Sequence, residues 1–226
     1  MLKDARAEVT VRAAMAAKDD AIQAAVNQAA AGGRNKDAVL RQIEQRCIFA
    51  GVYGKDTPLD AVVPNILSEL SEAQRRPSKQ GAFALRNGVY DDRHAAIRKQ
   101  AYPYRPACSA KNGDPVLEVT CDGKVVGYLA CHGDYFDDLS LLPAFHGCGI
   151  AKALICTAAK LSKSGNLSLD VRACNLPAIA LYTKLGFDKS TNEYQPFYDW
   201  HGGYSMNAQA AEVAKQMPAG FDTSAL

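Results

Sequence analysis

The order of strand-like and helix-like segments in the middle of the chain constrains the fold more than any other feature of the sequence. Two β-prone runs, Val116–Cys121 and Lys124–Ala130, flank Asp122-Gly123, a pair typical of a type I′ hairpin turn. We then expect a strand, a helix, a second strand and a second helix, at Leu139–Leu142, Gly149–Ser162, Leu167–Val171 and Ala178–Leu185. This order predicts an α+β fold around a sheet of mixed strand direction.

Further segments extend this pattern in both directions. Ahead of the hairpin, Ala82–Leu85 is consistent with a first strand and Asp92–Tyr102 with a helix. Beyond the second helix, two strands are predicted at Tyr194–Tyr198 and Tyr204–Met206. The last residues, Pro218–Leu226, show no pattern, and we expect them to form a loose tail.

The first third of the chain has a helical character. Residues 3–30 are rich in alanine and contain neither glycine nor proline, which favours a helix. Two more helices are expected at 37–50 and 57–76. In the first helix the larger apolar residues share one stripe: Val11, Met15, Ile22 and Val26. This stripe can pack on the chain's own domain or on another copy, which would make a homo-oligomer.

Composition excludes several classes of protein. The 226 residues include 26 basic and 24 acidic side chains, and no basic block stands out, so we expect no nucleic-acid partner. No uncharged run reaches the ~18 residues that span a bilayer, and no leader segment is apparent at the start. None of the seven cysteines forms a Cys-x-x-Cys pair, so no metal site is expected. We therefore expect a cytoplasmic protein with no membrane partner.

One glycine-containing turn joins a predicted strand to a predicted helix, at His146-Gly147-Cys148-Gly149-Ile150-Ala151. Its glycines let the backbone turn and approach a ligand closely. The unpaired N–H groups of a helix start attract anions such as a pyrophosphate. The turn lacks the patterns of nucleoside triphosphatases and of dinucleotide-binding folds. On pattern alone, a plain strand-to-helix connection is the better explanation.

A second motif lies between Asn175 and Phe187. Its residues Asn175, Ala178 and Tyr182 are spaced three and four apart, so they share one face of a helix. That helix ends at Lys184-Leu185-Gly186-Phe187. Taken alone, Tyr182 would be a core residue with its hydroxyl group at the rim.

Together the two motifs resemble the acetyl-CoA site of the GNAT N-acetyltransferase superfamily. Pro143, Gly149 and Ala151 match the family pattern Arg/Gln-x-x-Gly-x-Gly/Ala and the proline before it, while His146 replaces the Arg or Gln. The resemblance covers about Phe83 to Met206. It implies a mixed, mostly antiparallel sheet flanked by helices at 79–210, with a helical extension at 1–78 and a tail at 211–226.

The resemblance also implies roles for individual residues. The backbone of Leu141 and Leu142 would pair with the pantetheine arm of acetyl-CoA, and Asn175 would hydrogen-bond the same arm. His146 could reach a phosphate, and Tyr182 would donate a proton to the leaving thiolate. The full set of implied acetyl-CoA contacts is Leu141, Leu142, His146, Gly147, Cys148, Gly149, Ile150, Ala151, Lys152, Asn175, Ala178 and Tyr182.

A general base is needed because an amine must lose a proton before it attacks. We rank Asp138 and Asp137 first, since they begin the strand that leads to the glycine turn. The alternatives are a chain of water molecules or one of three further side chains, Glu118, His132 and Asp170. Residues of all these types are more often ordinary surface or turn residues than catalytic bases.

The family resemblance implies transfer of acetyl from acetyl-CoA to a primary amine, either a small molecule or a protein lysine or N-terminus. The aromatic residues between Tyr194 and Tyr204 could hold a cationic amine, or they could pack on the core. The alternative function is a non-catalytic acyl-CoA sensor or assembly protein. The unusual His146, the unassigned base and the helical extension favour that alternative, whereas Tyr182 favours an enzyme.

Overall fold

A computed structural model describes residues 19–31, 83–102, 110–172, 175–189, 195–196 and 202–226, together with isolated helical residues between 13 and 47. The chain divides into two compact units. One consists of 1–76 with 174–177, and the other of 77–173 with 178–226.

The first unit contains the described helix α2, Asp19–Ala31. Asp19 and Asp20 lie in its first turn, where negative charge complements the helix dipole. Ile22 and Val26 are buried, as the predicted apolar stripe requires. The described residues between 36 and 47 are also helical, whereas the helix predicted at 57–76 lies outside the described residues.

The second unit is built on one mixed sheet with the strand order β6-β8-β5-β4-β3-β2-β1-β9, and β7 pairs with β8 at its side. Strands β1 to β4 are antiparallel, β4 and β5 are parallel, and β5 and β8 are antiparallel. The strand bounds are β1 Phe83–Val89, β2 Pro115–Cys121, β3 Lys124–His132, β4 Tyr135–Leu141, β5 Asn166–Arg172, β6 Asp188–Lys189, β7 Gln195–Pro196, β8 Gly202–Gln209 and β9 Phe221–Ala225. The predicted α+β class is confirmed.

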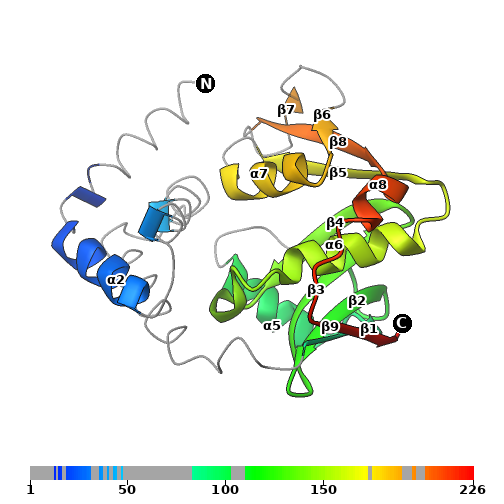
Figure 1. Ribbon diagram of the computed structural model, residues 1–226, viewed down its shortest axis with the longest axis horizontal. Helices are drawn as coiled ribbons and strands as arrows, with labels where there is room; N and C mark the ends of the chain where they lie inside the picture. The colour runs from blue at the N-terminus through cyan, green and yellow to red at the C-terminus, as the bar shows by residue number, and fades with distance from the viewer. Residues whose placement is uncertain are drawn as a thin grey trace. The chain divides into compact units, whose positions relative to one another are not determined.

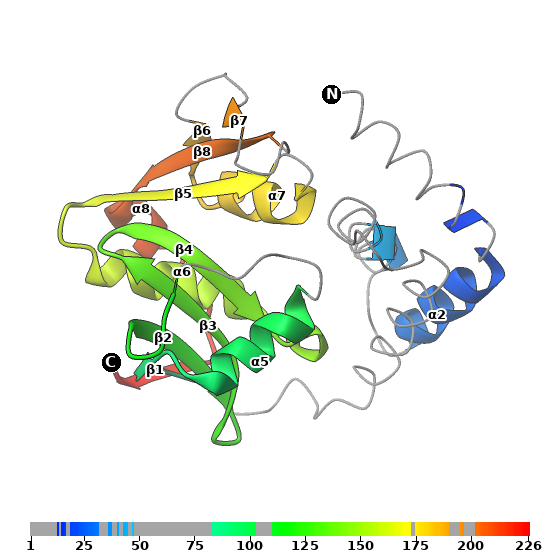
Figure 2. The same ribbon diagram turned by 180° about the vertical axis from the view of Figure 1, so that it is seen from behind.

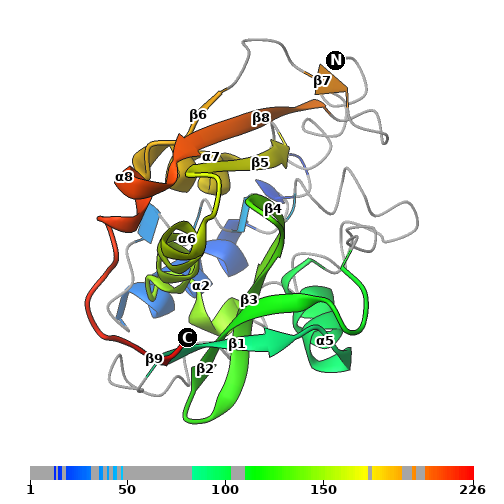
Figure 3. The same cartoon turned by 90° about the vertical axis from the view of Figure 1, so that its right-hand side faces the viewer.

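Helices cover both faces of this sheet (Figures 1 and 2). Helix α5 packs on one face and α6 on the other, as the edge-on view in Figure 3 shows. Helices α7 and α8 share the larger hydrophobic core with α6, whereas α5 covers a smaller core that contains Tyr90 and Tyr128. The bounds are α5 Asp92–Ala101, a short 3₁₀ helix Pro143–Phe145, α6 Ile150–Leu161, α7 Leu176–Lys184 and α8 Ala210–Ala214.

The hairpin between β2 and β3 has the predicted turn. Asp122 has φ 50° and Gly123 has φ 77°, so both central residues are in the left-handed region, as a type I′ turn requires. The turn sets the register of the first pairs, Cys121 with Lys124 and Thr120 with Val125, and a bulge then shifts the register at Val119.

Strands β4 and β5 are paired only where they begin. Their parallel ladder joins Tyr135 to Ser168 and Phe136 to Leu169, and the two strands then separate (Figure 2). A β-bulge lies at the point of separation, since Ala130 and Cys131 of β3 face Asp138 and Phe136 and leave Asp137 as the extra residue. Residues 137–141 of β4, called here the open edge, therefore have no ladder partner on the β5 side within the described chain.

Two sequence predictions need correction. The strand expected at Leu139–Leu142 begins earlier, at Tyr135, because Asp137 and Asp138 interrupt its apolar pattern. The loose tail predicted at Pro218–Leu226 is wrong, since Phe221–Ala225 form β9, which pairs in parallel with β1. Only Phe221 of β9 is even partly buried, so the strand leaves almost no apolar pattern. The aromatic residues at 197–201 lie outside the described residues.

Candidate active site

The open edge of β4 presents backbone groups that β3 does not use. Leu142 N–H donates to Val126 O at 2.9 Å, so Leu142 and every second residue before it, back to the bulge, direct their backbone N–H and C=O groups toward β3. In an antiparallel pair alternate residues face away from the partner, so Leu139 and Leu141 direct their N–H and C=O groups toward the β5 side. An extended ligand could therefore add to this edge as a strand does.

The same hydrogen bonds correct one sequence prediction and add a residue. Leu142 was expected to pair with a ligand through its backbone, but its N–H binds Val126 and its C=O accepts from Phe145 N–H at 2.9 Å. Leu139, which the sequence did not single out, takes its place beside Leu141. The alternation along a bulged strand could have indicated this only if the bulge were known.

Two side chains already contact the carbonyl groups of the open edge. Tyr102 Oη donates to Leu139 O at 3.3 Å, and His146 Nε2 lies 3.2 Å from Leu141 O. His146 was predicted to reach a phosphate, whereas here its ring links the loop after β4 to the end of that strand. A carbonyl oxygen has two lone pairs, so each of these carbonyls can still accept a second hydrogen bond.

Residues 143–149, called here the cofactor loop, connect β4 to α6. Gly147 and Gly149 have φ 79° and 80°, which only glycine adopts without strain. Gly149 is the N-cap of α6 and provides no side-chain cap. Ala153 N–H donates to Gly149 O at 3.0 Å. The N–H groups of the first turn, Ile150 to Lys152, precede this bond and therefore have no partner within the helix.

This arrangement suits an anion. The N–H groups of the first turn and the positive end of the helix dipole lie together at the N-terminus of α6. Gly147 and Gly149 are exposed, while Cys148, Ala151 and Lys152 are half-buried. Ile150 differs from the rest of the predicted contacts, because its side chain is buried in the core and only its backbone can face a ligand.

Tyr182 lies on α7, on the face of the sheet that α6 also covers. Its side chain is 9% exposed, and its ring packs on Phe187 with centroids 5.6 Å apart. Phe187 in turn lies 6.0 Å from Phe136, the last β4 residue paired with β5. These ring contacts tie Tyr182 to the strand position at which β4 and β5 separate.

The α7 segment has the predicted shape. Asn175 directly precedes the helix, Ala178 is half-buried, and Tyr182 follows one turn later. The helix ends at Lys184, and Gly186 follows it with a φ of 92°, which lets Phe187 N–H return to Tyr182 O at 3.0 Å.

Asp138 is surrounded by donors. It is 3% exposed, and its Oδ2 accepts from Tyr128 Oη at 2.5 Å and lies 3.2 Å from Arg98 Nε. Ser140 Oγ approaches both carboxylate oxygens. Burial, with the charge of Asp138, raises the pKa of Tyr128 far above its ordinary value, so the phenol remains protonated and donates.

Asp137 is placed differently from Asp138. It is the extra residue of the bulge, at the start of the open edge. Its Oδ2 is buried, and no hydrogen-bond partner for this atom lies among the described residues. Burial, then the charges of Asp134 and Asp137, raise the pKa of Cys131 to about 12, so the Cys131 thiol lies within the field of this carboxylate.

The other base candidates are engaged or remote from the open edge. Asp170 accepts from Tyr135 Oη at 3.1 Å and from Ser205 Oγ at 2.6 Å. His132 is exposed at the end of β3. The third candidate, Glu118, lies on β2 in an ion-pair cluster.

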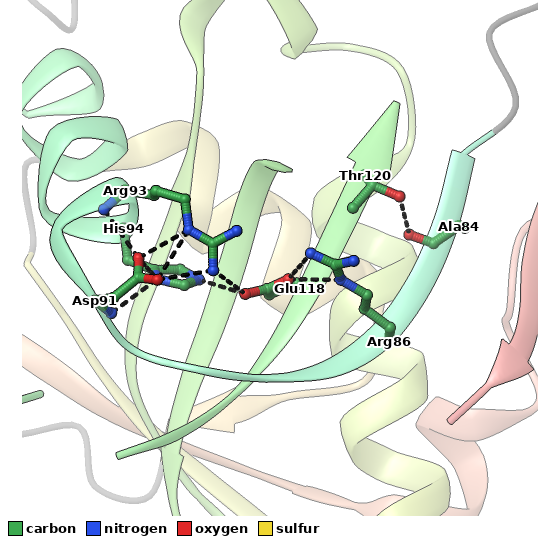
Figure 4. Close-up of polar contacts among 7 residues, drawn as sticks. All are labelled: Ala84, Arg86, Asp91, Arg93, His94, Glu118 and Thr120. Atoms are coloured by element: carbon green, nitrogen blue, oxygen red, sulfur yellow. Dashed lines mark hydrogen bonds and ion pairs between the residues drawn. The ribbon is translucent and has the colours of Figure 1, made fainter. Parts of the chain in front are cut away.

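This cluster, which the sequence did not predict, joins α5 to β1 and β2 (Figure 4). Glu118 is 1% exposed and is paired with Arg86 at 2.7 Å and with His94 Nε2 at 3.0 Å. Asp91 N–H donates to His94 Nδ1, so in the neutral ring the proton is on Nε2, the nitrogen on the Glu118 side. A buried carboxylate needs such partners, so Glu118 has a structural role.

Two further features of the described residues concern membrane-spanning helices and metal sites. No helix among them is long and apolar enough to cross a membrane. No group of His, Cys, Asp and Glu side chains in the described part of the chain is arranged to hold a metal ion.

Comparison with known proteins identifies a family model that matches residues 81–187, the acetyltransferase (GNAT) family. This match includes the open edge, the cofactor loop and Tyr182. No curated protein matches the chain.

Solved structures of N-acetyltransferases resemble parts of the chain. The ribosomal-protein-S18-alanine N-acetyltransferase of Escherichia coli is 22% identical, with a TM-score of 0.39, over 56% of this chain and 94% of its own. Naa50 of Arabidopsis thaliana, in complex with the bisubstrate analogue CoA-Ac-MVNAL, is 19% identical, with a TM-score of 0.45, over 57% and 99%. A variant of the spermidine N-acetyltransferase SpeG of Vibrio cholerae is 14% identical, with a TM-score of 0.47, over 61% and 99%.

Proposed function

Since residues 81–187 form a domain of the GNAT acetyltransferase family, we propose that the protein transfers an acetyl group from acetyl-CoA to a primary amine by direct attack. One observation carries the proposal. Strand β4 separates from β5 at a bulge, and its open edge leads directly into an uncapped helix N-terminus. An extended amide chain that ends in a pyrophosphate suits these two neighbouring features.

The residues of the chain divide the binding of acetyl-CoA between them. The backbone groups of Leu139 and Leu141 pair with the pantetheine arm, and His146 holds the carbonyl of Leu141 at the end of the strand. The N–H groups from Gly147 to Lys152 bind the pyrophosphate. Asn175 and Ala178, at the start of α7, contribute further contacts to the arm.

Two side chains carry the proton transfers. Asp137 removes a proton from the ammonium form of the acceptor, and its unpartnered Oδ2 supports this role over the engaged Asp138. The amine nitrogen then bonds to the acetyl carbon as the carbon–sulfur bond breaks, and the nitrogen releases a second proton to solvent to give the neutral amide. Tyr182 donates its phenolic proton to the leaving sulfur, since a phenol with an ordinary pKa near ~10 is protonated at neutral pH.

The acceptor is a primary amine of a small molecule or of a protein lysine or N-terminus. A panel of both kinds of amine is therefore the appropriate screen.

Kinetics of two variants test the proposal. With acetyl-CoA and an amine from the panel, Tyr182→Phe and Asp137→Asn should each lower kcat about 100-fold, the usual contribution of a general acid or base. Neither should change the dissociation constant of acetyl-CoA, because both act on protons in transit. Release of free thiol measures turnover, and calorimetry measures binding.

A matched variant controls for the loss of a tyrosine hydroxyl group. Tyr135→Phe also removes one, from a hydrogen bond with Asp170, and should leave kcat unchanged. Full activity in Tyr182→Phe would contradict the assigned acid. Tight acetyl-CoA binding by the wild type without turnover of any amine would instead favour the acyl-CoA sensor.

A further inference from the structure

The C-terminal strand β9 begins at the end of the sheet that carries the cofactor loop. Strand β9 lies beside β1 (Figure 3). The two strands are parallel, and Phe221 is in register with Phe83. Because neighbouring strands from β1 to β4 are antiparallel, β1 begins at the end of the sheet where β2 and β4 finish. Strand β9 is parallel to β1 and begins at the same end. The cofactor loop leaves β4 at this end of the sheet, so the first residue of β9 can lie near the loop.

Phe221 reaches the cofactor loop directly at Gly149 and, through Phe83, at Phe145. Its ring stacks on Phe83, with centroids 5.5 Å apart and an interplanar angle of 21°. Phe83 meets Phe145, the last residue of the 3₁₀ helix, edge to face at 6.3 Å. At the other end of the loop, Phe221 Cε2 lies 3.9 Å from the point that a Cβ on Gly149 would occupy.

The loop needs such support because of its composition. Gly147 and Gly149 have wide conformational freedom, and no side chain caps the helix that follows them. Aromatic pairs of this geometry contribute about 0.5–1.5 kcal/mol beyond their buried area. The Phe221–Phe83–Phe145 contacts therefore supply, from outside the loop, order that the loop sequence lacks.

We propose that Phe221 is a positioning residue for the pyrophosphate site, and that the C-terminal strand holds the cofactor loop in its anion-binding conformation. The inference rests on the proposed function, because it takes the loop as the pyrophosphate site. The contacts of Phe221 reach Gly149 and, through Phe83, the 3₁₀ helix, whereas its strand adds nothing to the open edge of β4. Phosphate binding should therefore depend on Phe221 and pantetheine binding should not.

Two ligands separate positioning from general stability. Acetyl-CoA contains the pyrophosphate, and S-acetylpantetheine contains only the arm and the acetyl group. In the full-length chain, Phe221→Ala should weaken acetyl-CoA binding about tenfold, equivalent to one hydrogen bond to a charged group, and leave S-acetylpantetheine binding unchanged. Calorimetry measures the first ligand and NMR line broadening the second, at a temperature well below the unfolding midpoint.

Three variants keep the test decisive. Thr223→Ala changes an exposed residue of the same strand and should bind both ligands like the wild type. Phe221→Tyr keeps the ring and should restore acetyl-CoA binding, and Phe221→Leu replaces the alanine variant if that does not fold. Unchanged acetyl-CoA binding in Phe221→Ala, or equal loss of both ligands, would overturn the inference. Failure of the wild type to bind acetyl-CoA would instead refute the proposed function, and this inference with it.

Discussion

At the scale of single residues, two neighbouring carboxylates of β4 have opposite surroundings. Asp138 is buried among the donors Tyr128, Ser140 and Arg98, while one oxygen of Asp137 is buried without a described partner. The sequence indicated both as candidates but could not separate them. A bulge in β4 places Asp138 among donors and leaves Asp137 without them, and this bulge depends on the pairing of β3 with β4.

Removal of the Tyr128 hydroxyl group tests the role of Asp138. Tyr128→Phe should lower the free energy of unfolding by about 1–3 kcal/mol, because Asp138 then loses a donor in a buried site. Tyr135→Phe removes a comparable hydroxyl from the exposed Asp170 and should cost less than about 0.5 kcal/mol. Urea denaturation measures both losses in the free energy of unfolding. Equal losses would contradict the claim that burial of Asp138 makes its hydrogen bond with Tyr128 more stabilising than an exposed one.

At the scale of secondary-structure elements, α5 depends on its N-terminal residues. Asp91 caps the helix by accepting from Arg93 N–H at 2.9 Å, and His94 completes a capping box. The side-chain hydrogen bond from Arg93 holds the pKa of Asp91 well below its usual range. The stabilisation from this charge should therefore be complete above the unfolded pKa of about 3.9 and be lost as the pH falls toward the folded value.

Two substitutions separate the cap from the charge. Asp91→Ala should cost about 1 kcal/mol at neutral pH, and Asp91→Asn less, because asparagine is also a good N-cap. The stability difference between wild type and Asp91→Asn should narrow as the pH falls below about 4. Thermal unfolding between pH 7 and 3 measures it, and a difference independent of pH would contradict the charge interaction.

Elements with a strong local signal were predictable from the sequence. The hairpin turn, α5, α6 and α7 carry their own turn residues, caps or apolar periodicity, and the structure confirms them. The beginning of β4 was missed because two aspartates interrupt its alternation. Strand β9 was missed because four of its five residues are exposed at the edge of the sheet.

At the scale of the whole molecule, the candidate site depends on long-range pairing. The cofactor loop could be predicted because its glycines form a local sequence pattern. No such pattern indicated that Leu139, Tyr102 and Phe221 belong to the site. Each of these joins the site through an element distant in the chain: the β3–β4 register, the end of α5 and the parallel pairing of β9 with β1. No local pattern contains that information.

Calorimetric titration with acetyl-CoA tests the central claim, that the loop between β4 and α6 binds its pyrophosphate. Gly149→Glu adds a carboxylate at the helix N-terminus, and Gly165→Glu is a matched control, since both glycines have φ near +80° and a Cβ at either position would meet no atom closer than 3.9 Å. We predict wild-type binding in about the micromolar range, retained by Gly165→Glu and abolished in Gly149→Glu. Absence of wild-type binding, or equal binding by all three proteins, would contradict the account.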